Sequence, residues 1–112
     1  MDDALVIRFA AKSVGIVHAI GLLPKDGVSL ITSDGVKWNP LTSDSDALWL
    51  MSTLVVQNRL RVGIDGQGVT CYYNHDGVFV PYHWSYDNIE PTKAFRLCVT
   101  HAAAELSKLG QV

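Results

Sequence analysis

The sequence predicts an α+β fold in which three helices frame a mainly antiparallel sheet, in the order helix, two strands, helix, three strands, helix. Three segments have apolar residues at the three- and four-residue spacing of amphipathic helices. Residues 60–84 alternate apolar and polar positions with the period of strands. The chain has no internal repeat or linker. We therefore expect a single domain over residues 1–112, built as a helix–sheet–helix (α/β/α) sandwich.

The first helix is expected from about Asp3 to Val14, where apolar residues recur near helical spacing. Asp2 and Asp3 suit the positive N-terminal end of a helix, and Gly15 suits the position that follows its last turn. Residues 16–23 are apolar and fit either a strand or irregular core chain.

Two short strands should follow, each set off by a turn. Residues 24–27 read Pro-Lys-Asp-Gly, in which proline presets φ and glycine accepts a positive φ. Residues 28–32 then form a strand, and the Ser-Asp-Gly of residues 33–35 turns the chain towards residues 36–38.

The second helix should begin within residues 39–46. Pro40 holds Asn39 extended, and the serine and aspartate side chains that follow can accept hydrogen bonds from unpaired helix N–H groups. The helix should end near Gln57 and Asn58, and its buried face comprises Ala47, Leu50, Met51, Leu54 and Val55.

Three strands and a third helix complete the chain. Residues 66–68 (Gly-Gln-Gly) and the pair Asp76-Gly77 are hairpin turns between alternating segments. The helix opens at Pro91, whose missing N–H has no partner at the first helical position, and Gly110 ends it. Its apolar stripe comprises Phe95, Val99, Ala102, Leu106 and Leu109.

Composition narrows the possible partners and the compartment. Nine Lys and Arg against 11 Asp and Glu give a net charge of −2, so no broad positive field attracts a phosphate backbone. No apolar run approaches the roughly 20 residues of a membrane span, and the chain starts with acidic residues where a secretory signal is basic. We expect a cytoplasmic protein without a membrane partner, and the charge disfavours non-specific binding to nucleic acid. Cys71 and Cys98 are expected to be buried reduced thiols, with a structural disulfide as the alternative.

Three segments together resemble a phage family. They are residues 36–48 (VKWNPLTSDSDAL), 91–96 (PTKAFR) and 102–106 (AAAEL). Their order is similar to that in the small phage and prophage proteins of the phage ABA-sandwich domain family, which are related to the NinX-like proteins. The resemblance implies a helix–sheet–helix sandwich encoded by a phage or prophage and located in the bacterial host cytoplasm. It brings no catalytic residues.

Two polar clusters near the second helix are candidate sites. Trp38 and Asn39 could form a recognition patch, or Trp38 could pack in the core while Asn39 satisfies backbone groups. Asp44 and Asp46 could form a carboxylate pair for a metal or for acid–base chemistry, but helix capping explains both. We favour the structural interpretation of both clusters.

Residues of the predicted hairpins offer further candidates. His75, His83 and Cys71 could be imagined as a metal or Cys-His site, but metal-ligand spacing is missing and strand residues alternate faces. The aromatic residues are more distinctive, because any that face outward would suit a partner surface or stacked bases. They are Tyr72, Tyr73, Phe79, Tyr82, Trp84 and Tyr86. The alternative is that helices bury them on both faces of the sheet.

These observations predict a non-enzymatic protein-interaction module without metal or cofactor. Its expected surface comprises Trp38, Asn39, Tyr82, Trp84 and Tyr86, and its expected partner is a host or phage protein or a second copy. One alternative is a nucleic-acid-associated module that uses Arg59, Arg61, Lys93 and Arg96. The other is an enzyme whose pocket gathers at least two of His75, His83, Asp44 and Asp46.

Overall fold

The eight elements follow one another in the order that the sequence predicts, which confirms the α+β class. The structure is a computed structural model that describes residues 2–19, 21–22 and 24–109. Its elements are α1 (Asp3–Ser13), β1 (Leu30–Ile31), β2 (Lys37–Trp38), α2 (Asp44–Val56), β3 (Leu60–Ile64), β4 (Gly68–His75), β5 (Val78–Ser85) and α3 (Pro91–Leu109).

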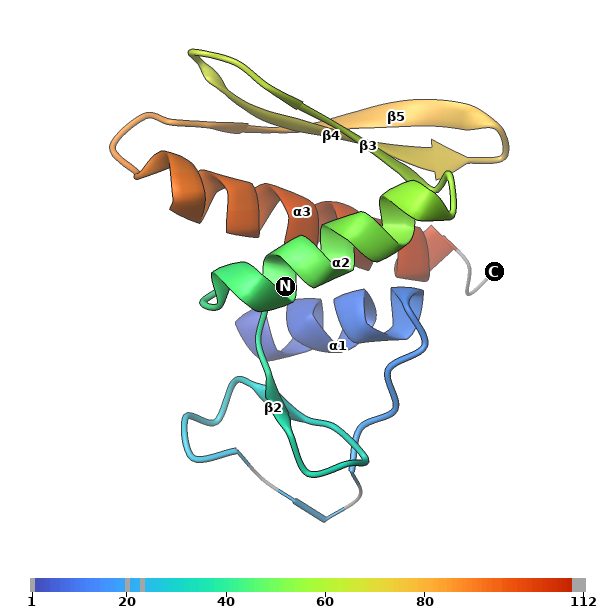
Figure 1. Cartoon of the computed structure of the whole chain (residues 1–112), viewed down its shortest axis with the longest axis vertical. Helices are drawn as coiled ribbons and strands as arrows, with labels where there is room; N and C mark the ends of the chain where they lie inside the picture. The colour runs from blue at the N-terminus through green and yellow to red at the C-terminus, as the bar shows by residue number, and fades with distance from the viewer. Residues whose placement is uncertain (1, 20, 23, 110–112) are drawn as a thin grey trace.

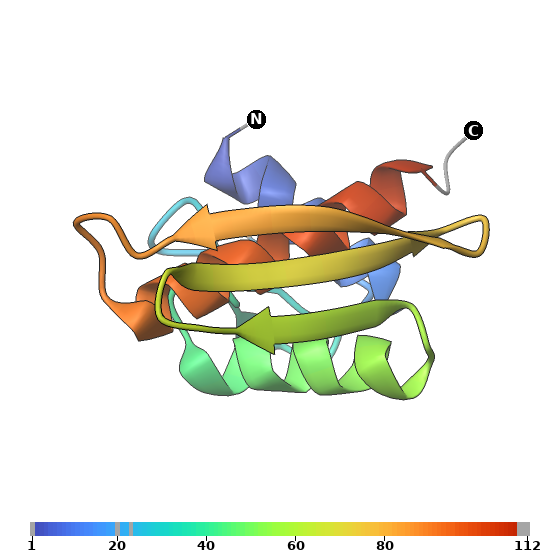
Figure 2. The ribbon, with the colours of Figure 1, turned by 90° about the horizontal axis from the view of Figure 1, so that it is seen from above.

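The elements stack in layers (Figure 1). The antiparallel sheet β3-β4-β5 is at one end, α3 and α2 lie against it, α1 lies beyond α3, and the short β1-β2 ribbon is at the other end. Seen from above, the outer face of the sheet carries no helix within the described part of the chain (Figure 2). This layer order differs from the expected helix–sheet–helix order, because α1 packs on α3 and not on the sheet.

Small side chains on α3 explain the position of α1. Ala102, Ala103 and Ala104 are fully or almost fully buried, and so are Ala10 and Ala11 of α1. Alanine faces let two helices approach closely, since interaxial distance depends on the side chains at the contact. Helix α3 is therefore the centre of the molecule, with the sheet on one side and α1 on the other.

The predicted signals act at the ends of α1. The Asp2 side chain accepts a hydrogen bond from the Leu5 N–H at 2.9 Å, as an N-cap does. Gly15 follows the helix with a φ of +75°. At the same end, the Arg59 guanidinium donates to the Ser13 carbonyl. The predicted stop of α3 at Gly110 lies outside the described residues.

The meander has the predicted register and turns. Cys71 pairs with Val62 on one side and Tyr82 on the other, and Tyr72 pairs with Arg61 and Pro81. Asp76 and Gly77 both have positive φ, as a two-residue type I′ turn requires. The β1-β2 ribbon is shorter than expected, and the segment before it contributes an isolated bridge from His18 to Thr32; residues 20 and 23 of that segment lie outside the description.

Candidate functional site

Trp38 and Asn39 are buried, so neither belongs to an exposed surface. Trp38 is part of the hydrophobic core. The Asn39 side chain accepts a hydrogen bond from the Leu41 N–H at 3.0 Å and donates to the Ser29 hydroxyl at 2.9 Å. Their inclusion in the expected surface is thus corrected in favour of the structural interpretation, because a side chain that satisfies buried polar groups is unavailable to a partner.

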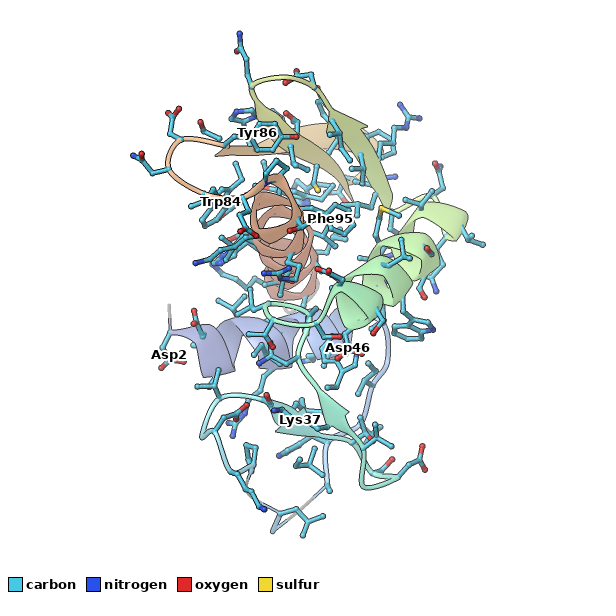
Figure 3. All side chains as sticks on the ribbon, turned by 60° about the vertical axis from the view of Figure 1, so that its left-hand side comes forward. Asp2, Lys37, Asp46, Trp84, Tyr86 and Phe95 are labelled. Carbon is cyan, nitrogen blue, oxygen red and sulfur yellow. The ribbon has the colours of Figure 1, made fainter. Side chains whose placement is uncertain are left out.

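Asp44 and Asp46 have separate structural partners. Asp44 accepts a hydrogen bond from the Arg96 guanidinium at 2.6 Å. Asp46 accepts from the Asn39 N–H at 2.9 Å and lies at the start of α2, on the side of the β1-β2 ribbon (Figure 3). Within residues 2–19, 21–22 and 24–109, no group of three or more His, Cys, Asp and Glu could hold a metal ion. The two carboxylates thus stabilise the chain around the α2 N-terminus.

His75, His83 and Cys71 of the meander do not come together in one site. His83 makes a 2.8 Å hydrogen bond with Thr70 on the outer face of the sheet, and His75 lies 3.8 Å from Asp76 at the turn. Cys71 and Cys98 are free and buried in the core, as expected. The hydrogen bond that the Cys71 thiol donates to the Cys98 sulfur, together with burial, raises the pKa of Cys71, so it stays protonated and is a poor nucleophile.

Tyr82 and Trp84 belong to a half-buried aromatic cluster with His101 of α3. The ring centroids of Trp84 and His101 are 5.1 Å apart, and those of Tyr82 and His101 are 6.0 Å apart. Burial lowers the pKa of His101. Sequence reasoning missed His101, although it lies two residues from Val99 of the predicted stripe. The cluster joins β5 to α3, and its main contribution is packing.

Tyr86, the third predicted aromatic residue, lines an apolar groove elsewhere. The groove encloses about 360 Å³ between the N-terminal ends of α2 and α3 and the adjoining strands. Figure 3 shows Phe95 and Trp84 on different sides of α3, so the groove and the aromatic cluster are separate features. The residues that line the groove are Asp44, Leu48, Ile64, Val69, Tyr86, Pro91, Thr92 and Phe95.

An exposed apolar surface continues from this groove along α2. We call it the α2 surface; it consists of Leu48 (54% exposed), Trp49 (49%), Val55 (43%), Val56 (86%) and Ile64 of β3 (63%). Sequence reasoning assigned Val55 to the buried face and missed the surface. The available signal was the uncharged run of residues 47–58, because an ordinary surface helix has charged residues on its outer face.

The free edge of β3 lies beside the α2 surface. The Asp65 N–H donates to the Gly68 carbonyl and the Asn74 N–H donates to the Arg59 carbonyl, so odd-numbered residues of β3 pair with β4. The backbone groups of Val62 and Ile64 therefore point away from β4. At the other edge of the sheet, the Tyr86 N–H donates to the Gln67 carbonyl, so even-numbered residues of β5 pair with β4. The backbone groups of the odd-numbered residues of β5 therefore point away from β4, and one of these residues is Pro81. Proline has no N–H to offer, so the two edges differ in their capacity to pair.

Comparison with known proteins found no matching family model, curated protein or solved structure. In the described residues, no helix has both the length and the apolar character needed to cross a membrane. The groove, the α2 surface and the free edge of β3 are the features of the described chain that could receive a partner.

Proposed function

We propose that this chain is a non-enzymatic protein-interaction module that binds its partner through the α2 surface and the adjoining groove. The observation that carries the proposal is the exposure of five large apolar side chains, four of them on α2 and one on β3. Contiguous apolar patches on soluble proteins mark interaction sites, and aromatic anchors such as Trp49 contribute most to binding. The groove next to Leu48 offers a recess for a partner side chain.

The resemblance to small phage proteins supplies the proposed setting. In that setting the chain is an accessory protein of a phage or prophage, present in the cytoplasm of a bacterial host, and its partner is a host or phage protein. The surface itself supports an association with protein, because it is apolar and has no positive charge.

The two alternative functions have weaker support. Arg59 donates to the Ser13 carbonyl and Arg96 donates to Asp44 and to the Leu41 carbonyl, so both cations serve the fold and not a phosphate backbone. An enzyme would need a pocket with two of the four candidate polar residues. The groove is lined by Asp44 alone among them, and Asp44 is paired with Arg96.

A single substitution tests the proposal. Trp49→Asp puts a charge in the centre of the α2 surface and should weaken partner binding at least about 30-fold, which corresponds to the roughly 2 kcal/mol of a binding hot spot. Tyr72→Asp is the matched control, because Tyr72 is similarly exposed (39%) but lies on the outer face of the sheet.

The tagged chain is expressed in bacteria, and the proteins that crosslink to the wild type are identified by mass spectrometry. The affinity of each identified protein is then measured with purified components. We expect the same partner to bind the wild type and the Tyr72→Asp variant with similar affinity, and to bind the Trp49→Asp variant much more weakly. Equal binding to all three chains, or loss with Tyr72→Asp alone, contradicts the proposal.

A further inference from the structure

We infer that the partner binds as an extended segment that pairs with the free edge of β3, lies over α2 and inserts a large apolar side chain into the groove. The inference rests on the proposed function, because it uses the same surface. It adds the conformation of the bound segment.

The two edges of the sheet differ in the backbone groups that they offer. Val62 and Ile64 each direct an N–H and a C=O away from β4, and neither N–H donates a hydrogen bond to any described residue. Pro81 removes an N–H from the outward side of β5, which is the usual protection of an edge strand. A row of unpaired backbone groups is a template for an added strand, so pairing is favoured at β3.

Helix α2 lies beside the free edge of β3. Figure 2 shows α2 running along the β3 edge and projecting beyond it, so a strand added to β3 would lie over this helix. Leu48 and Val55 are seven residues apart and share one line along α2. Both are exposed, and Leu48 lines the groove together with Ile64. The inward side chains of an added strand would thus cover apolar groups that are now in water, which stabilises the pairing.

The test starts from a library of random 12-residue peptides displayed on phage and selected against the full chain. Selected peptides should carry apolar residues at every second position. Synthetic copies are then titrated against wild type and Leu48→Asp, which changes an exposed side chain and should reduce affinity at least about tenfold.

Amide hydrogen exchange in the complex distinguishes strand addition from other modes of docking. The Val62 and Ile64 amides should exchange at least tenfold more slowly with peptide bound. The Phe79 and His83 amides, which point outward at the β5 edge, should not change. N-methylation of the peptide amides that face β3 should abolish binding, while methylation of the alternate amides should preserve it.

Each failure has a separate meaning. Suppose that the selected peptides bind wild type but not Leu48→Asp. If they leave the exchange of the Val62 and Ile64 amides unchanged, or if their apolar residues have helical spacing, strand addition is wrong and the proposed function stands. A wild-type dimer in sedimentation that Leu48→Asp dissociates assigns the surface to a second copy and overturns the inference. If no selected peptide binds the wild type more tightly than it binds Leu48→Asp, both proposals are contradicted.

Discussion

Asn39 shows how a polar residue that stands out in the sequence can have a structural role. Its side chain joins the Leu41 backbone to Ser29, and Asp46 accepts from its N–H. The local sequence was sufficient to predict the cap, because Pro40 and the following Ser and Asp residues specify it. The sequence allowed Trp38 either in the core or in an exposed patch, because its burial depends on contacts with residues distant along the chain.

We predict that Asn39→Ala lowers the free energy of unfolding by about 2 kcal/mol, since it leaves the buried Leu41 N–H without its hydrogen-bond acceptor. Denaturant titration of wild type and variant measures the change. Thr42→Ala, at an exposed position nearby, is the control and should change the stability by less than about 0.5 kcal/mol. A loss for Asn39→Ala as small as that of the control would contradict the proposed role of Asn39.

His101 gives a prediction for pH dependence. Burial lowers its pKa below the ordinary 6.5, so the unfolded chain takes up a proton at a higher pH than the folded chain. The folded state should therefore lose stability as the pH falls from 7 through the unfolded pKa towards the lower folded pKa. NMR titration of His101 should show a midpoint below 6.5, and His101→Phe should remove this part of the acid dependence. A midpoint at or above 6.5 would contradict the assigned burial effect.

At the scale of elements, the local signals were enough to predict the helices and the meander. Caps, Pro91, the Asp76-Gly77 turn and apolar periodicity all act within a few residues, and each appears where expected. The layer order was harder to predict, because the Ala-rich face of α3 has two readings from sequence. It could face solvent or receive another helix, and only the packing of α1 decides between them.

Close packing of α1 on α3 gives a prediction at this scale. Ala103→Leu adds volume at a fully buried position and should destabilise the protein by about 1–3 kcal/mol through overpacking. Lys93→Leu makes an exposed change on the same helix and serves as the control, with an expected effect below about 0.5 kcal/mol. Thermal and denaturant unfolding measure both. An unchanged stability in Ala103→Leu would mean that α1 and α3 are not in close contact.

At the scale of the whole molecule, the candidate site arises where three elements meet. Helix α2 supplies exposed apolar side chains, β3 supplies unpaired backbone groups, and α3 and β4 complete the groove. The sequence predicted a protein-interaction module but located it on other residues, of which Tyr86 alone lines the groove. The rest was not predictable, because the exposure of α2 depends on which faces the other layers cover.

The most direct test of the central claim is cross-saturation NMR on the chain bound to its partner, with methyl groups labelled on this chain and the partner irradiated. The account predicts that saturation reaches the methyl groups of Leu48, Val55, Val56 and Ile64. It should spare Val78, which is as exposed as Ile64 (65% against 63%) but lies on β5, separated from β3 by β4. Saturation of Val78 without an effect on the α2 surface would contradict the account.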